Sequence, residues 1–406
     1  MHKHNIIKLL RLQGKRIKFD KEVIDVENNI AYFYIHKDIV EHSCPCCKQK
    51  TKRIKDHRYQ KIKHIPINGF KTYLVLKKTR LLCTNCGKSF DMDYSDIVNK
   101  RFRSSNALFF KIIDDLKSSN SFKDISKANF VSIGVIIRYL LLWSYLMQWE
   151  NITTLPKHIG IDEFKGNCDG SKYLFHIYNL DTGETIYILK SRSFYDIVDF
   201  FNNITNRNEV EIVTMDLYSP FKNAVKAKLK KAIIIADRFH YTRIIGNALD
   251  SLRIRIWHNT KGNEKKYFKN LKKKLLKDID TVPKEKLEKF ENSLNHAFEL
   301  DGNLKYGYQL YQKFLKIKSS SSYIEKVKLF RDWLDDAQSC TIPEFKSASN
   351  TLLLWNKEIV NSFNYSYTNS SVEGKNNKIK VIKRIAYGFK KLSTFRARIK
   401  MCDCKI

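Results

Sequence analysis

The stretch "VTMDLYSPFKNAV", residues 213–225, decides how the central part of this chain folds. Its apolar start is typical of a buried strand, and it ends on Asp216. The pair Ser219-Pro220 then has the pattern of a helix start, with Ser219 as N-cap and Pro220 in the first helical position. Asp216 is therefore either a turn residue or a metal ligand at the end of a strand.

The sequence around this stretch predicts an α/β domain. A hairpin turn, "DTGE", lies between two of the strand-like segments. The predicted order is strand, strand, strand, helix, strand, helix, strand, which is the order of an RNase H-like fold with three antiparallel strands followed by parallel additions. The segments are residues 158–164, 172–180, 184–191, 193–204, 209–216, 219–229 and 232–240.

This order predicts that the first and fourth strands are neighbours, so that Asp162 and Asp216 lie together. Two such carboxylates repel each other unless divalent cations hold them, and Mg²⁺ prefers hard oxygen ligands. Glu163 is the alternative to Asp162, but neighbouring strand residues point to opposite faces, and pairing "IGID" with "VTMD" favours Asp162. Asp237 is either an Asx turn or part of this site, and His240 either a core histidine or part of it.

A third carboxylate is needed to complete such a site, and Glu373 is the candidate. It follows a mostly helical, basic stretch at about residues 245–365 and opens a further helix. The tetrapeptide Ser370-Ser371-Val372-Glu373 also fits a capping box, in which Glu373 would only cap the backbone. Spacing does not choose between these roles.

Two Cys-x-x-Cys pairs, Cys44/Cys47 and Cys83/Cys86, predict a tetrahedral zinc ribbon. Strand-like sequence between them can bring the pairs together, and Gly87 allows the tight turn that follows the second pair. Cys46 competes as a ligand with poorer spacing. The alternatives are four unlinked thiols or a redox pair, although neither pair opens an obvious βαβ unit.

Residues 104–146 predict a helical DNA-binding module. An apolar stripe from Leu108 to Leu116 marks a first helix. A short helix at 122–128, a turn at 129–131 and a longer helix capped by Ser132 then have the layout of a helix-turn-helix. In a helix-turn-helix, Ser132 and Arg138 would face DNA. The alternative interpretation of these three helices is a plain three-helix core without a DNA-binding role.

The composition fits a nucleic-acid partner. The chain of 406 residues has 75 Lys+Arg against 42 Asp+Glu, a formal net charge of +33, and is 43% hydrophobic. The charge indicates a polyanion, whereas an A·T-rich coding sequence would give similar lysine enrichment. Nine cysteines argue against a disulfide framework, and no apolar run reaches the ~18 residues of a membrane span.

With these features in this order, the chain resembles DDE-type transposases of bacterial insertion sequences, specifically the ISL-three family. The resemblance covers nearly the whole chain. It rests on the helix-turn-helix and on the motifs "CPCC…CTNCGKSF", "IGIDEF", "VTMDLYSPF", "ADRFHYTRI" and "SSVEGKNNKIKVIKRIAYGF".

The resemblance implies an acidic triad of Asp162, Asp216 and Glu373 that binds a pair of Mg²⁺ (or Mn²⁺) ions, with Asp237 and His240 in support. It implies a DNA transposase that cleaves phosphodiester bonds at the terminal inverted repeats of its element and joins the 3′-OH ends to target DNA. Its expected partners are double-stranded DNA and at least one further copy of the chain in a synaptic complex. Its expected setting is the bacterial cytoplasm, in association with DNA and with no membrane.

The predicted domains are an N-terminal region (1–100) with the zinc ribbon at about 40–92, a helix-turn-helix domain (101–152) and a catalytic domain (153–406). The basic helix after Glu373 would hold DNA phosphates, or it is only a solvated face. Two other functions remain open, namely a DNA-binding regulator with a decayed catalytic domain and an RNase H-like nuclease. The basic residues of that helix are Lys375, Lys378, Lys380, Lys383 and Arg384.

Overall fold

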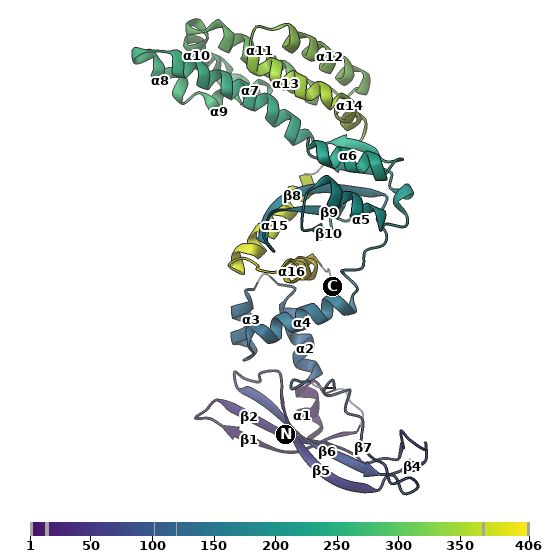
Figure 1. Cartoon of the computed structure of the whole chain (residues 1–406). Helices are drawn as coiled ribbons and strands as arrows, with labels where there is room; N and C mark the ends of the chain where they lie inside the picture. The colour runs from purple at the N-terminus through teal and green to yellow at the C-terminus, as the bar shows by residue number, and fades with distance from the viewer. Residues whose placement is uncertain (1–2, 13–15, 101, 119, 368–369, 404–406) are drawn as a thin grey trace. The chain divides into compact units, whose positions relative to one another are not determined.

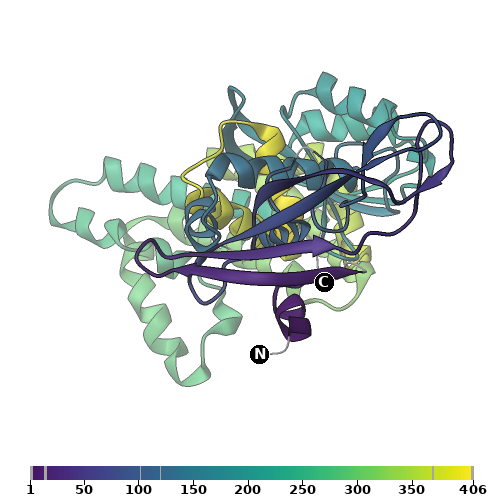
Figure 2. The same cartoon turned by 90° about the horizontal axis from the view of Figure 1, so that it is seen from below.

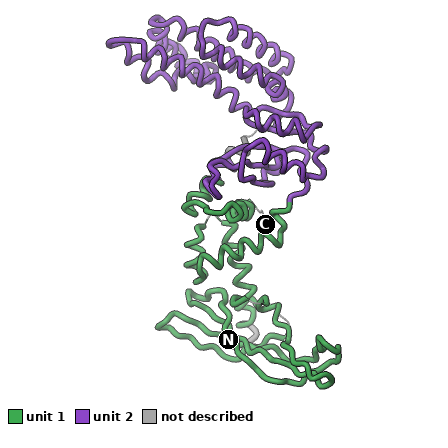
Figure 3. The backbone as a smooth tube through the Cα atoms, viewed as in Figure 1, with its two compact units in different colours: residues 1–151, 379–406 green, residues 152–378 purple. Residues whose placement is uncertain are grey.

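The computed structural model describes residues 3–12, 16–100, 102–118, 120–367 and 370–403, with the side chains of 3–5 and 370–373 excepted. The chain divides into two compact units (Figure 3). Unit 1 consists of residues 1–151 and 379–406, and unit 2 of residues 152–378. Each unit has its own hydrophobic core.

Unit 1 begins with a β-sheet whose strand order is β1-β2-β6-β5 (Figures 1 and 2). Alternate residues of β2 and β6 are buried, which is the pattern of a sheet with one face on a core. The sheet includes the segment expected to join the two cysteine pairs. Its elements are α1 (Lys3–Leu9), β1 (Ile17–Asp25), β2 (Ile30–Lys37), β5 (Ile54–Lys63), β6 (Lys71–Leu82) and β7 (Ser89–Asp91), and the separate hairpin is β3 (His42–Ser43) with β4 (Lys50–Thr51).

Buried His64 ties this sheet to the helices that follow. Its Nε2 lies 2.8 Å from the carbonyl oxygen of Leu10, and its Nδ1 lies 2.7 Å from the Oγ of Ser105. Ser105 is the N-cap of the next helix, and its Oγ accepts the N–H of Leu108 at 3.2 Å. Since the carbonyl can only accept, Nε2 carries the proton, and the Ser105 hydroxyl donates to Nδ1.

The helical part of unit 1 contains α2 (Asn106–Asp115), α3 (Phe122–Ala128), α4 (Ile133–Leu146) and α16 (Leu392–Asp403). The predicted apolar stripe is buried, and Ser132 is the N-cap of α4 as predicted, although its side chain makes no capping hydrogen bond. Ala397 and Met401 of α16 complete the core between these helices. The last helix of the chain therefore packs with residues far earlier in the sequence, as in the hydrogen bond from Arg398 to the carbonyl oxygen of Leu116, 282 positions away.

Unit 2 contains a mixed sheet with the strand order β10-β9-β8-β11-β12. The first three strands pair antiparallel, whereas β11 pairs in parallel with both β8 and β12. This is the predicted order of elements, and the short strands β11 and β12 are almost fully buried, as parallel strands usually are. The elements are β8 (His158–Cys168), β9 (Ser171–Asn179), β10 (Thr185–Leu189), α5 (Phe194–Asn202), β11 (Ile212–Met215), α6 (Ser219–Lys228) and β12 (Ile233–Ala236).

The helix after Asp216 begins one residue earlier than predicted. The N-cap of α6 is Tyr218, so the prediction of Ser219 as N-cap is wrong. The N–H of Tyr218 donates to the Asp216 carbonyl at 2.8 Å, and this tight turn starts the helix at once. Pro220 still lies in the first turn, where its missing N–H has no helical partner to lose.

After β12 the chain forms a helical layer that begins with the 22-residue helix α7. Trp333 and Trp355 are buried in its core, as expected for structural tryptophans. Near the end of this layer, the Asn361 side chain donates to the carbonyl of Ile234 on the edge strand β12 at 2.8 Å. The helices of this layer are α7 (Arg238–Asn259), α8 (Lys265–Lys269), α9 (Lys272–Leu275), α10 (Lys284–Leu300), α11 (Gly302–Ser319), α12 (Tyr323–Ser339), α13 (Pro343–Leu354) and α14 (Asn356–Asn364). The next helix, α15 (Ser370–Ile385), is not part of this layer and continues from unit 2 into unit 1 after Lys378.

Among the described residues, no single helix has both the length and the apolar character needed to cross a membrane. Only α3 and α4 taken together pass that test, and they are bent by 108° with respect to each other.

Candidate functional site

Three aspartates occupy equivalent positions on three neighbouring parallel strands, within β8 and directly after the last residues of β11 and β12. Ile161 of β8 pairs with Met215 of β11, and Met215 pairs with Ala236 of β12. The residue that follows each of these in the sequence is an aspartate: Asp162, Asp216 and Asp237. The register of the sheet therefore brings together carboxylates that are up to 75 positions apart in the sequence.

The three carboxyl groups are crowded and largely removed from water. The carboxyl groups of Asp162 and Asp216 lie close enough to shift each other's pKa. Burial raises the pKa of Asp162 to about 6, and burial together with the charges of Asp162 and Asp237 raises the pKa of Asp216 to about 8. Crowded carboxylates of this kind favour either a shared proton or a bound cation.

The residues fit a divalent cation. The Oδ1 of Asp216 is buried and has no hydrogen-bond partner in the described part of the chain. Nε2 of His240 lies 3.1 Å from this oxygen, but the geometry does not make a hydrogen bond. Asp216, Asp237 and His240 each offer a ligand atom within 4.8 Å of the others. Carboxylate oxygens in such a cluster are the ligands that Mg²⁺ and Mn²⁺ prefer.

His240 is held as a neutral imidazole with its proton on Nε2. Burial, followed by the charge of Arg243, lowers the pKa of His240 to about 4. The guanidinium of Arg243 lies 3.2 Å from Nδ1 of His240, and because a guanidinium can only donate, Nδ1 is the acceptor. The remaining proton is on Nε2 and faces Asp216. In this tautomer Nε2 carries a proton and cannot bind a metal ion, so the carboxylates rather than His240 are the candidate cation ligands.

Both Asp162 and Glu163 lie close to Asp216, so strand alternation does not separate them fully. Asp162 contacts the carboxyl group of Asp216, whereas Glu163 lines a cavity of about 190 Å³ that Asp216 and His240 also line. Glu163 forms an ion pair with Arg192. Asp162 has no basic partner of that kind among the described ion pairs, which leaves it the better cation ligand.

Asn376 is a site residue that sequence reasoning missed. It is buried in α15, and its side-chain amide donates to Oδ2 of Asp162. The N–H of Glu163 donates to Oδ1 of Asp162 at 2.7 Å, so both oxygens of Asp162 are oriented. The predicted third acid, Glu373, lies in the first turn of α15, but its side chain is outside the described residues. Asn376 follows the predicted ligand Glu373 by three residues, which places both on one face of the helix. This spacing could have identified Asn376 as a site residue from the sequence.

The structure brings the four predicted zinc ligands together in unit 1. The Sγ atoms of Cys44, Cys47, Cys83 and Cys86 all lie within 4.8 Å of one another. The Cys44–Cys86 and Cys47–Cys83 sulfur distances are 3.6 and 3.4 Å. A tetrahedron with Zn–S bonds of ~2.3 Å has S–S edges of ~3.8 Å, so the cluster is close to the size that zinc requires. Cys46 is exposed and outside the cluster.

The two cysteine loops repeat one hydrogen-bonding pattern. In the first loop, the N–H of Cys44 donates to the carbonyl of Gln49, and the N–H of Lys48 donates to the carbonyl of Cys44. In the second, Cys83 and Gly87 make the equivalent bonds. Lys48 and Gly87 both have positive φ, 63° and 69°. The N–H of Gln49 lowers the pKa of Cys47 to about 6, which favours the thiolate that zinc binds.

The predicted DNA-binding residues lie on two helical segments. Ser132 and Arg138 are exposed on the first half of α4 in unit 1. Arg398 of α16 is buried instead and donates to carbonyl oxygens of Leu116, Ser118 and Asn120, so this part of the basic C-terminal stretch is structural. On α15, Lys378, Lys380 and Arg384 are exposed, and Lys375 and Lys383 are half-buried.

A strongly basic α/β protein with a thiolate cluster in one unit and a carboxylate cluster on neighbouring strands in the other has the features of a nucleic-acid-processing protein. Comparison with known families defines it further. Residues 159–399 match the ISL3 family model, described as a transposase, and residues 41–86 match the zinc-finger of transposase IS204/IS1001/IS1096/IS1165. The chain belongs to the ISL3 family of DDE transposases. The zinc-finger match and the four-cysteine cluster together support Zn²⁺ in the N-terminal region.

Two relatives differ in how much of the chain they cover. The transposase for insertion sequence element IS1001 of Bordetella parapertussis is 20% identical over 378 residues, 88% of this chain and 87% of that protein. A protein of Lactococcus lactis subsp. lactis described as an ATP-dependent protease is 33% identical over 129 residues. That match spans 29% of this chain and 40% of the length of the Lactococcus protein.

Proposed function

We propose that this chain is a DNA transposase that cuts phosphodiester bonds at the terminal inverted repeats of its element and joins the freed 3′-OH ends to target DNA. The observation that carries this proposal is the parallel register of β8, β11 and β12, which aligns Asp162, Asp216 and Asp237 across the sheet. The family and the net charge of +33 support DNA as the substrate.

Asp162, Asp216 and Glu373 are the proposed ligands of a pair of Mg²⁺ or Mn²⁺ ions. When bound, the cations would supply the positive charge that activates a water or 3′-OH nucleophile and stabilises the leaving oxygen. Asn376 and the Glu163 N–H fix the orientation of Asp162, so that carboxylate needs little rearrangement to bind a cation. Glu373 precedes Asn376 by one helical turn on the same face of α15, which supports its place in the set.

The residues around the acids have proposed supporting roles. Asp237 adds negative charge next to Asp216 and would help attract cations. His240 holds a proton on Nε2 facing Asp216, and Arg243 fixes that tautomer. Leu217 and Phe221 form an apolar wall of the cavity beside Asp216 and would limit the access of water to the reacting phosphate.

We also propose that the sheet of unit 2 is RNase H-like and that α3 and α4 form a helix-turn-helix. The strand order with three antiparallel strands followed by parallel β11 and β12 supports the first. The 108° bend between α3 and α4, with Phe130 at φ 50° in the turn, supports the second. Ser132 and Arg138 would then contact DNA from α4, and the exposed cations of α15 would contact phosphates. A synaptic dimer or higher assembly is part of the same proposal.

The test is cleavage of a labelled duplex that carries the terminal inverted repeats of the element, with Mg²⁺ or Mn²⁺ present. Wild type should nick the duplex at the repeat end, and Asp216→Asn should abolish nicking while DNA binding is retained. Asp199→Asn is the control, because Asp199 is an exposed aspartate of α5 outside the cluster. Cleavage by Asp216→Asn at the wild-type rate refutes the site. Binding without cleavage by wild type favours a regulator with a decayed catalytic domain.

A further inference from the structure

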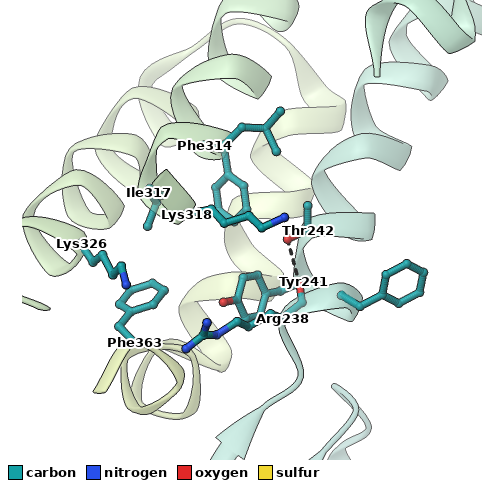
Figure 4. A pocket seen from close by; sticks show the side chains of 10 residues that line it. Arg238, Tyr241, Thr242, Phe314, Ile317, Lys318, Lys326 and Phe363 are labelled. Atoms are coloured by element: carbon teal, nitrogen blue, oxygen red, sulfur yellow. Dashed lines mark hydrogen bonds between the residues drawn. The ribbon is translucent and has the colours of Figure 1, made fainter. Parts of the chain in front are cut away.

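Unit 2 contains a second cavity, which the proposed cleavage chemistry does not use. It has a volume of about 250 Å³ and is lined by residues of α7, α11, α12 and α14 (Figure 4). Its inner walls are aromatic and aliphatic, from Tyr241, Phe314, Ile317 and Phe363. Tyr241 and Phe314 meet edge to face with their ring centroids 6.1 Å apart.

The rim of this cavity is cationic. Arg238, Lys318 and Lys326 contribute to its lining, and no acidic residue is among the described residues that line it. Arg238 donates to the carbonyl oxygens of Ser362 and Tyr365, at 3.1 Å and 3.2 Å. These partners are neutral, so the positive charge of Arg238 is not cancelled. An apolar interior under three positive charges suits a ligand with a flat ring system and an anionic backbone.

Helix α7 connects this cavity to the carboxylate cluster. Arg238, Tyr241 and Thr242 line the cavity, whereas His240, Arg243 and Ile244 line the cavity beside Asp216. Within each set the residues lie three and four positions after the first, so each set lies on one face of the first two turns of α7. The two sets lie on different faces. A helix with its side chains is about 10–12 Å across. A DNA strand covers that distance in a few nucleotides, so a strand cut at the carboxylates can reach the second cavity.

The size of the cavity limits what it can hold. Small-molecule sites usually have volumes of about 300–1,000 Å³, and 250 Å³ lies just below that range. The volume accommodates one ring system and excludes a folded nucleotide with its sugar and phosphates inside. The phosphates would therefore stay outside, at the rim where the lysines lie.

We propose that this pocket, lined by Arg238, Tyr241, Phe314 and Phe363, takes one unpaired base of the DNA that the protein cuts. The base packs against the aromatic walls, and Lys318 and Lys326 contact the phosphates on either side of it. This assignment rests on the proposed function, because DNA is the substrate in both. It adds a strand-distorting step, in which a nucleotide near the cleavage site leaves the base stack.

The test uses the full chain with the Asp216→Asn substitution, which prevents cutting during a binding measurement. Three mixed-sequence duplexes serve as probes: one fully paired, one with a single unpaired adenine, and one with an abasic nucleotide at the unpaired position. Fluorescence anisotropy gives the Kd of each. We expect the unpaired adenine to bind about tenfold more tightly than the paired duplex, the size of one base–aromatic stack. The abasic probe has the same flexibility but no base, so it should lose most of that gain.

Two pocket variants and one matched control complete the test. Phe363→Ala should remove the preference for the unpaired adenine, and the double variant Lys318→Gln/Lys326→Gln should reduce it severalfold. The control is Lys316→Gln/Lys328→Gln, which removes two exposed lysines from the same two helices outside the pocket. It should keep the preference. The lysine variants carry the test even where Phe363→Ala destabilises the fold.

Each outcome supports or overturns the proposal. Equal binding of the adenine and abasic probes overturns it, and so does a preference that survives both pocket variants. A cleavage assay with protein that retains Asp216 separates this proposal from the proposed function. End-repeat cleavage by a protein whose Asp216→Asn form shows no preference for the unpaired adenine refutes the pocket alone. A base preference in a protein that never cuts the end repeats refutes the proposed transposase chemistry alone.

Discussion

The cysteine cluster of unit 1 and the carboxylate cluster of unit 2 are assembled in different ways. Each cysteine pair is held by a short loop with its own hydrogen bonds, so the ligand spacing is local. The aspartates come from three strands and meet because the parallel register places them side by side across the sheet. Local loop hydrogen bonds orient each cysteine pair, whereas the register of the sheet gathers carboxylates whose burial raises the pKa of Asp162 and Asp216. We therefore expect the zinc-bound cysteine cluster to stabilise the fold, and the carboxylate cluster without cations to destabilise it.

The largest expected effect concerns the cysteine cluster. Cys83→Ser should remove zinc and unfold the loops around β3 and β4, because structural zinc in small fingers contributes about 10–16 kcal/mol of apparent binding free energy. Elemental analysis of protein purified without chelators should fall from about one zinc per chain to near none, and limited proteolysis should then cut residues 41–86. Cys46→Ser is the matched control, since Cys46 is exposed and outside the cluster. Zinc retained by Cys83→Ser, or lost by Cys46→Ser, contradicts the assignment.

A second prediction concerns pH and the buried His64 of unit 1. Burial lowers the pKa of His64 from 6.5 to about 4. The folded protein therefore holds this histidine neutral, and the unfolded chain binds the proton first as the pH falls. The contribution of neutral His64 to the free energy of unfolding is fully present above pH ~6.5. It decreases as the pH falls toward ~4, and the total loss is about 3 kcal/mol.

Hydrogen exchange of peptides from β5 and β6, measured between these pH values, gives that local free energy. His64→Gln is the comparison variant, because its amide can donate to the Leu10 carbonyl and does not titrate. Its local stability should vary less with pH over this window. An equal pH dependence in both proteins excludes His64 as the cause.

The sequence predicted the features of the two clusters that depend on local spacing, but not the side chains that pack around them. The two Cys-x-x-Cys pairs and the alternating strands are readable because they depend on local spacing. The strand order also placed Asp162 beside Asp216. The sequence did not predict Asn376 as the partner of Asp162, because that contact joins residues 214 positions apart. It likewise missed Arg243 behind His240 and the burial of Arg398, since partners for buried polar groups are set by tertiary packing.

The carboxylate cluster should respond to mutation in the direction opposite to the cysteine cluster. Asp216→Asn removes one of three crowded acids, so without divalent cations the variant should be about 2 kcal/mol more stable than wild type. Urea unfolding followed by hydrogen exchange in β11 measures this difference. Asp199→Asn should change stability by less than about 0.5 kcal/mol, as is usual for a surface substitution. A destabilised Asp216→Asn means that its carboxylate is satisfied within the protein and that the cluster is structural.

The smallest expected effect compares the two cysteine loops with each other. Lys48 adopts the left-handed conformation that Gly87 adopts at the equivalent position. A Cβ at Gly87 would meet no atom within 4 Å, so Gly87→Ala adds only the cost of a side chain at positive φ, about 1 kcal/mol. Zinc affinity, measured by competition with a chromogenic chelator, should fall about fivefold. Lys48→Gly removes the same backbone cost but makes the unfolded loop more flexible, so its affinity should stay within about twofold of wild type. A large loss in Lys48→Gly would show that the lysine side chain, rather than the backbone, supports the first loop.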